Sequence, residues 1–168
     1  SAPKHLGRAM IRFFVLLAVI LDALPAGAEP ARRHMVAAGH PLAVEAGLMM
    51  LRDGGSALDA AVAVQAVLTL VEPQASGIGG GAFIMLRRAA DGGMEAWDGR
   101  EAAPAAATPA LFLRDGRPMP FLEAIMGGRA VGVPGTLPVL EAAHRAHGKL
   151  PWARLFEPAI RLAEEGFP

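Results

Sequence analysis

The segment Ala57–Val71 reads ALDAAVAVQAVLTLV and is apolar at almost every position. Ser56 before it is a preferred helix N-cap, Asp59 stands near the third helical position, and Pro73 ends the segment. A helix that is apolar on all sides has no face suited to water, so it belongs inside a hydrophobic core. The rest of the fold must therefore supply elements that surround this helix.

The neighbouring segments predict both helices and strands. A helix is expected to begin at Pro41, which suits a first helical turn, and to end near Gly54, which suits a left-handed C-terminal position. Residues 82–88 and 94–98 are expected to be two strands of an antiparallel hairpin, with its turn around Asp91-Gly92-Gly93. Helices followed by a hairpin indicate an α+β fold or a layered sandwich.

The second half of the chain is less regular. Residues 102–126 are rich in proline and alanine and predict irregular structure with a short helix, and residues 130–135 predict a brief strand. Thr136 is expected to cap a helix that runs to His147, and residues 151–166 predict one or two short helices.

Composition excludes some classes of function. The 168 residues carry 16 basic and 16 acidic side chains, and no basic stripe with interleaved aromatic residues is found. We therefore expect no nucleic-acid partner. The chain has no cysteine, which excludes a disulfide framework, a thiolate metal site and a cysteine nucleophile within these residues.

The N-terminus resembles a secretory signal. Arg8 and Arg12 precede a short apolar run, residues 13–21, and Ala26-Gly27-Ala28 supplies the small residues of a cleavage site. The run is shorter than the ~20 residues that a transmembrane helix needs. We interpret residues 1–28 as a signal peptide, with Met10 a candidate initiator and the residues before it an upstream extension. Residues 29–168 are then expected to be secreted or periplasmic.

The glycine-rich stretch ASGIGGGAF, residues 75–83, has two interpretations. A phosphate-binding loop needs a strand before its glycines and a helix after them, whereas the expected order here is helix, glycines, strand. The favoured role is a tight turn into a buried strand, or a place where the backbone approaches another segment or a substrate. Ser76 lacks the Gly-x-Ser-x-Gly setting of a nucleophile and is expected to form turn hydrogen bonds.

Few other side chains suggest chemistry. His144 and His147 are three residues apart on an expected helix, but no third ligand accompanies them, so they are interpreted as a solvated helix end and no metal site is expected. Arg100 ends an expected strand beside Glu101 and could grip a carboxylate through two hydrogen bonds. From chemistry alone, a surface ion pair is the favoured interpretation of Arg100.

Taken together, several motifs resemble the start of the large subunit of the γ-glutamyltranspeptidases, also called γ-glutamyltransferases or glutathione hydrolases. Their order and spacing run through nearly the whole segment 35–168, and they read MVAAGHPLAVEAG, LRDGGSALDAAVA, VEPQASGIGGGAF, DGREAAPAAATP, AVGVPG and HGKLPWARLFEPAIRLAEEGFP. One departure is Ser56, where the family commonly has asparagine, and either residue can cap a helix.

The resemblance implies an N-terminal-nucleophile hydrolase with a four-layer αββα sandwich. The precursor cleaves itself, and the new N-terminal threonine of the small subunit attacks the γ-glutamyl amide of glutathione or a similar compound. The acyl group then passes to water, an amino acid or a peptide, and no cofactor takes part. Residues 29–168 would be the N-terminal part of the large subunit, an incomplete domain whose partner is the small subunit from the same precursor.

The resemblance also assigns site residues. The three threonines, Thr69, Thr108 and Thr136, do not lie in the Thr-x-His-x-Ser setting of the family nucleophile, so no catalytic residue is expected in this chain. Arg100 matches the family arginine that binds the α-carboxylate of the γ-glutamyl group, and Glu101 is a candidate support for it. Two alternatives stay open: a cephalosporin or glutaryl acylase of the same fold, and a non-catalytic truncated product.

Overall fold

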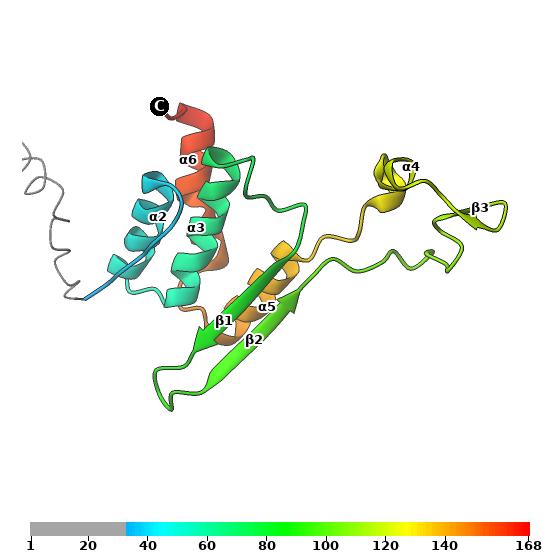
Figure 1. Ribbon diagram of the computed structural model, residues 1–168. Helices are drawn as coiled ribbons and strands as arrows, with labels where there is room; N and C mark the ends of the chain where they lie inside the picture. Colours follow the sequence, from blue (N-terminus) through cyan, green and yellow to red (C-terminus); the bar gives the residue numbers. More distant parts are fainter. Residues whose placement is uncertain (1–32) are drawn as a thin grey trace, which may run out of the picture. The chain divides into compact units, whose positions relative to one another are not determined.

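A computed structural model describes residues 33–168 (Figure 1). The predicted signal peptide, residues 1–28, lies outside this range. No helix within residues 33–168 is both long enough and apolar enough to cross a membrane. The elements, in chain order, are α2 (Pro41–Arg52), α3 (Ala57–Val71), β1 (Ala82–Arg87), β2 (Met94–Gly99), β3 (Leu113–Arg114), β4 (Arg117–Pro118), α4 (Phe121–Ile125), the 3₁₀ helix η1 (Gly128–Ala130), α5 (Thr136–His147), the 3₁₀ helix η2 (Trp152–Phe156) and α6 (Glu157–Glu165).

The first two helices begin and end where the sequence predicts. Pro41 opens α2, and the side chain of His40 caps it by accepting a hydrogen bond from the N–H of Leu42 (3.2 Å). Gly54 follows with φ +87°, the left-handed conformation that favours glycine. At α3, Ser56 and Asp59 form a reciprocal capping box, in which each side chain accepts a hydrogen bond from the other residue's N–H. These local signals explain why the two helices are separate.

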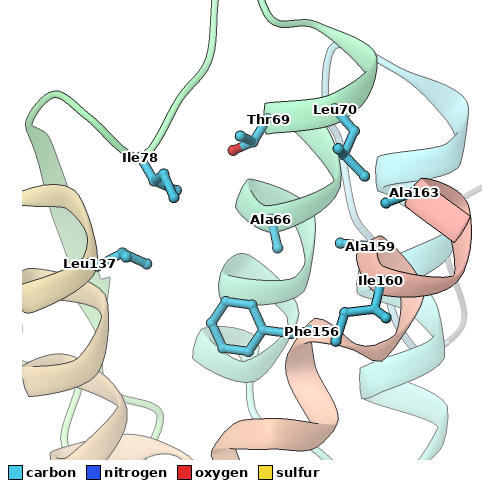
Figure 2. Close-up of a pocket in the computed structure, with 9 residues that line it drawn as sticks. All are labelled: Ala66, Thr69, Leu70, Ile78, Leu137, Phe156, Ala159, Ile160 and Ala163. Carbon is cyan, nitrogen blue, oxygen red and sulfur yellow. The ribbon is translucent and has the colours of Figure 1, made fainter.

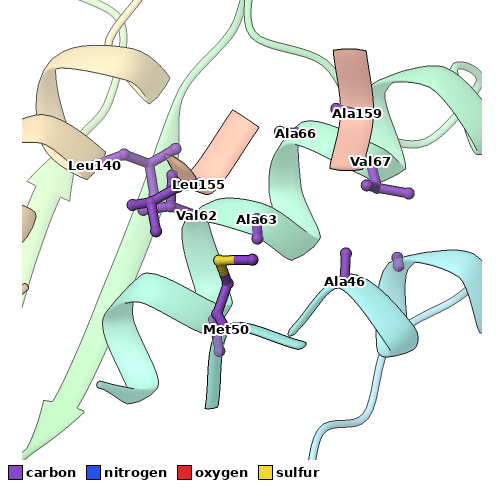
Figure 3. Packing of buried hydrophobic residues seen from close by; sticks show 11 residues of the cluster. Ala46, Met50, Val62, Ala63, Ala66, Val67, Leu140, Leu155 and Ala159 are labelled. Atoms are coloured by element: carbon purple, nitrogen blue, oxygen red, sulfur yellow. The ribbon is translucent and has the colours of Figure 1, made fainter. Parts of the chain in front are cut away.

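Helix α3 is the centre of the hydrophobic core and packs against α2, α5, η2 and α6. Figure 3 shows the side chains of α3 interleaved with those of the surrounding helices. The cluster is built mostly from small and medium apolar residues: Ala43, Ala46, Met50, Ala60, Val62, Ala63, Ala66, Val67, Leu140, Leu155 and Ala159. The core position predicted for this helix is confirmed, although its first turn also buries the carboxylate of Asp59.

Strands β1 and β2 form the predicted antiparallel hairpin, with Ile84 opposite Trp97. Side chains alternate between the two faces of the pair. Ile84 packs against the helical core, and both strands contact α5. On the other face Phe83 and Met85 are largely exposed, at 67% and 68%. The hairpin is therefore covered on one face only.

The segment between β2 and α5 differs from the expectation in detail. It contains the short helix α4 and the two-residue strands β3 and β4, which are joined by a turn with positive φ at Asp115 and Gly116. The strand predicted for residues 130–135 is reduced to a single bridge between Val133 and Ala102.

Helix α5 covers the predicted range, but the expected cap is wrong. Thr136 is the first helical residue rather than the N-cap, and no side chain caps the helix. The hydroxyl of Thr136 instead donates a hydrogen bond to the carbonyl oxygen of Gly80 (2.9 Å). The Thr136 side chain thus binds a distant backbone carbonyl and caps no N–H group of its own helix.

Candidate functional site

Three segments meet around Arg100 and Glu101. The residues themselves follow the last residue of β2, Gly99. The glycine-rich stretch, residues 77–81, lies against Glu101, and the turn at residues 132–135 leads past it into α5. Ala102 and Val133 join two of these segments through a pair of backbone hydrogen bonds, 3.3 and 2.8 Å long. The site is thus assembled from three separate parts of the chain, residues 77–81, 99–102 and 132–135.

Close approach between these segments requires glycine. A Cβ atom on Gly81 would lie 2.7 Å from Oε2 of Glu101 and 2.8 Å from the carbonyl oxygen of Gly99. Likewise, a Cβ on Gly135 would collide with the backbone of Gly99, and one on Gly99 would collide with Val139 of α5. Contacts of this kind are shorter than van der Waals packing allows. The C-terminal end of the glycine stretch, at Gly81, therefore serves close packing, as favoured from the sequence, and β1 rather than a helix follows it.

Arg100 is held at its backbone and free at its side chain. The backbone N–H of Arg100 donates to Oδ1 of Asp98 (2.8 Å), which fixes the exit from β2. Its side chain is 74% exposed, and Nε lies 3.7 Å from Oε2 of Glu101. This separation is too long for a good hydrogen bond, so most of the guanidinium donors stay available to a ligand.

A concavity of about 300 Å³ adjoins Arg100. It lies between the end of β2 and the first turns of α5, and its lining combines Trp97, Asp98 and Arg100 with small and apolar residues such as Val133, Pro138 and Ala142. A planar guanidinium at the edge of a small concavity can bind a carboxylate through two parallel hydrogen bonds. The geometry thus suits a small ligand with a carboxylate at one end.

The backbone of the glycine stretch is held at both ends. Nε2 of Gln65, on α3, donates to Oγ of Ser76 (2.8 Å), so the serine hydroxyl binds a helix side chain rather than its own turn, which was the prediction. At the other end, the carbonyl oxygen of Gly80 accepts hydrogen bonds from the N–H groups of Gly135 and Thr136 (3.0 and 3.1 Å) and from the Thr136 hydroxyl. The stretch is consequently a fixed wall beside Glu101.

The prediction of a solvated helix end for His144 and His147 is wrong. His144 Nε2 lies 3.0 Å from the carbonyl oxygen of Leu150 and 3.2 Å from Oδ1 of the fully buried Asp59. Both neighbours are acceptors, so we assign the hydrogen to Nε2. Asp59 also accepts from the N–H of Lys149 (3.0 Å). The sequence marked Asp59 only as a capping residue, because its partners lie far along the chain.

His147 contacts the hairpin instead. Its Nε2 lies 2.7 Å from Oε2 of Glu95, which also pairs with Arg88 at 2.6 Å. These hydrogen bonds, first to Arg88 and then to His147, hold the pKa of Glu95 below its usual value. Arg88 likewise lowers the pKa of Asp91. Both histidines therefore anchor the C-terminal end of α5. Their hydrogen-bond partners, Asp59, Leu150 and Glu95, do not include Arg100 or Glu101.

A second concavity, of about 280 Å³, is almost entirely apolar (Figure 2). Ala66, Thr69 and Leu70 of α3 line one side, Phe156, Ala159, Ile160 and Ala163 line another, and Ile78 and Leu137 complete it. The Thr69 hydroxyl donates to the carbonyl oxygen of Gln65 (3.0 Å) within its own helix, so its hydrogen is not free for a ligand with a charged end.

The described part of the chain brings together no metal ligands either. Within residues 33–168, no group of three or more His, Asp or Glu side chains could hold a metal ion. Arg100 thus marks the better candidate site.

Comparison with known proteins identifies the family of the chain. Residues 43–168 match the family model described as gamma-glutamyltranspeptidase. The chain belongs to the γ-glutamyltranspeptidase family. Both Arg100 and Glu101, the glycine stretch and the turn into α5 lie inside the matched range.

Similar proteins extend the family assignment. The glutathione hydrolase proenzyme of Bacillus subtilis is 50% identical over 135 residues, which cover 80% of this chain and 23% of that protein. Helicobacter pylori γ-glutamyltranspeptidase superposes with a TM-score of 0.74 at 40% identity, over 83% of this chain and 40% of that one. A cephalosporin acylase from Bacillus halodurans has a TM-score of 0.63 at 33% identity, over 86% and 27%.

These matches bear on fold and extent. The predicted fold class is confirmed: α+β, with the described elements forming part of an N-terminal-nucleophile hydrolase sandwich. The chain spans roughly a quarter of the length of the curated relatives it matches, 23% of one and 28% of another. The γ-glutamyltranspeptidase fold therefore includes much that lies outside these residues.

Proposed function

We propose that this chain is the N-terminal part of the large subunit of an enzyme that hydrolyses glutathione and other γ-glutamyl compounds and transfers their γ-glutamyl group. Arg100 carries the proposal. It is an exposed guanidinium with a loosely held partner, placed beside a small concavity within the range that matches the family. The name glutathione hydrolase proenzyme, given to several relatives, supports the substrate and a precursor that is cleaved.

In this proposal Arg100 binds the α-carboxylate at the non-reacting end of the γ-glutamyl group. Holding that end fixes the distance to the γ-carbonyl carbon and raises the effective concentration of the reacting groups. Glu101 limits the rotamers of Arg100 from the side of the glycine stretch. The role of these residues is to orient the substrate, while bond cleavage takes place elsewhere.

The nucleophile is proposed to be the N-terminal threonine of the small subunit from the same precursor. Its hydroxyl would attack the γ-carbonyl carbon while its own α-amine accepts the hydroxyl proton. The amine of the leaving group takes a proton as the amide bond breaks, and the ester intermediate then passes the acyl group to water, an amino acid or a peptide. The clearest check is a Thr-x-His-x-Ser segment in the coding sequence beyond residue 168.

Kinetics of the complete enzyme test the role of Arg100. Arg100→Lys keeps the charge but loses the planar fork, so the Michaelis constant for γ-glutamyl-p-nitroanilide should rise about tenfold to hundredfold, as expected for loss of a charged hydrogen bond. A matched donor without the carboxylate, 4-aminobutyryl-p-nitroanilide, should show the same kcat/KM with both enzymes. An unchanged Michaelis constant for the γ-glutamyl donor would contradict the assignment.

A second candidate function is that of a cephalosporin or glutaryl acylase, favoured by the similarity to the Bacillus halodurans acylase. A glutaryl group carries a carboxylate at the same distance from its reacting carbonyl as a γ-glutamyl group but lacks the α-ammonium. Arg100 could hold either acyl group. Comparing kcat/KM for γ-glutamyl and glutaryl anilides separates the two functions, and we expect the γ-glutamyl donor to be preferred.

We also propose export. Residues 1–28 would be removed as a signal peptide, which leaves a secreted or periplasmic protein that begins at Glu29. N-terminal sequencing of the exported large subunit tests this. A mature protein that begins upstream of Glu29 would contradict the cleavage position.

A further inference from the structure

Thr136 has a buried hydroxyl with a single long-range partner. The residue is 1% exposed and is the first residue of α5, one position after the N-cap Gly135. Its Oγ1 donates to the carbonyl oxygen of Gly80, 2.9 Å away and 56 residues earlier in the chain. The hydroxyl therefore links two segments that are distant in the sequence.

The link is reinforced on both sides. The N–H groups of Gly135 and Thr136 donate to the same carbonyl oxygen, so the Gly80 peptide receives three hydrogen bonds at the start of α5. The next residue, Gly81, approaches the carboxylate of Glu101 so closely that a Cβ atom there would lie 2.7 Å from Oε2. A shift of Gly80 would therefore move the wall against which Glu101 rests.

The same helix start also holds the strand that carries Arg100. Gly135 packs directly against the backbone of Gly99, and Val139, one turn further on, covers Gly99. Thr136 thus lies between two contacts, one to the glycine stretch and one to the end of β2. The segments on either side of the Arg100 and Glu101 pair both depend on the position of this helix turn.

We propose that Thr136 is a positioning residue for the substrate carboxylate. Its hydroxyl ties α5 to Gly80, which keeps the glycine stretch against Glu101 and the start of α5 against Gly99, and so fixes the backbone position from which the Arg100 side chain reaches the concavity. Being buried, Thr136 touches no substrate and acts only through these neighbours. This inference rests on the proposed function of Arg100.

The test uses the complete processed enzyme and two substitutions. Thr136→Val replaces the hydroxyl by a methyl group of similar size, and Thr136→Ser keeps the hydroxyl. For γ-glutamyl-p-nitroanilide, Thr136→Val should raise the Michaelis constant about threefold to tenfold, the range of one net hydrogen bond, with kcat changed less than the Michaelis constant. Thr136→Ser should restore the wild-type Michaelis constant.

A control variant tests whether Thr136 has only a structural role. The control should lose about as much stability as Thr136→Val through a hydroxyl that does not contact the Arg100 site. Ser56→Ala removes the capping hydroxyl of α3, away from Arg100, and should lower the melting temperature without changing the Michaelis constant. If Thr136→Val and Ser56→Ala leave the Michaelis constant equally unchanged, or if Thr136→Ser fails to restore it, the positioning role is overturned.

The double variant separates this inference from the proposed function. If Thr136 acts through Arg100, then Thr136→Val should add little to the Michaelis constant of Arg100→Lys, whereas independent roles would multiply the two effects. A raised constant in Arg100→Lys with none in Thr136→Val would overturn the inference and leave the proposed function standing. No change in Arg100→Lys would overturn both.

Discussion

Asp59 and Glu101 are both carboxylates beside basic side chains, but their surroundings are opposite. Asp59 is fully buried and accepts hydrogen bonds from the N–H groups of Ser56 and Lys149, with His144 Nε2 at 3.2 Å. Glu101 lies at an exposed edge, 3.7 Å from a guanidinium that is 74% exposed. A buried carboxylate with several donors stabilises the fold, whereas an exposed, loosely paired arginine can bind a ligand.

This difference predicts which substitutions affect folding and which affect catalysis. Removing Asp59 would leave buried donors without an acceptor, which costs far more than the loss of an exposed ion pair. Removing Arg100 exposes nothing and breaks only a weak contact. The following substitutions test the contrast, in order of expected effect.

Asp59→Ala should have the largest effect on stability. We expect the free energy of unfolding of the complete enzyme to fall by about 3 kcal/mol or more, because the N–H groups of Ser56 and Lys149 lose their buried acceptor. Denaturant unfolding measures the change, with Arg100→Gln as the control, for which a loss below about 0.5 kcal/mol is expected. Equal losses in the two variants would remove the distinction between the sites.

Gly81→Ala should have an intermediate effect on both stability and binding. Its Cβ would press on the Glu101 carboxylate and on the Gly99 carbonyl, so we expect a loss of about 1–3 kcal/mol and a raised Michaelis constant. Gly79→Ala is the matched control, since nothing lies within 4 Å of a Cβ built there. Thermal unfolding and steady-state kinetics of both variants provide the measurement, and similar behaviour of the two would argue against a fixed wall.

Glu95→Gln should have the smallest effect on stability, and this effect should depend on pH. The pKa of Glu95 is lowered from 4.5 by Arg88 and then His147, so its stabilising contribution is complete above about pH 4.5 and is lost as the pH falls through the lowered value. The difference in melting temperature between wild type and Glu95→Gln should be fully developed near pH 5 and shrink as the pH falls further. A difference that instead grows on acidification would show that the pairing does not favour the charged carboxylate.

Much of the local structure could be predicted from short-range signals. The Ser56 capping box, the helix start at Pro41 and the left-handed Gly54 each involve residues within a few positions of one another. The hairpin of residues 82–99 likewise follows from a short turn between two strand-forming segments. Such signals are read reliably because the interacting groups are neighbours in the chain.

The errors have a common cause. Thr136 was expected to cap its own helix and His147 to be solvated, but their partners are Gly80 and Glu95, 56 and 52 residues away. Likewise, His144 and Lys149 meet a carboxylate that the sequence marked only as a helix cap. No local pattern distinguishes a free polar side chain from one that finds a distant acceptor.

By itself the sequence determined the α+β class, the extent of the main helices and of the hairpin, and the family resemblance, and it proposed Arg100 as a binding residue. Only the tertiary structure decided why position 81 needs glycine, which hydroxyl binds the Gly80 carbonyl and which histidines anchor α5. The physical reason is that helix caps and turns are satisfied within a few residues, whereas close backbone contacts and buried hydrogen bonds depend on segments that folding brings together.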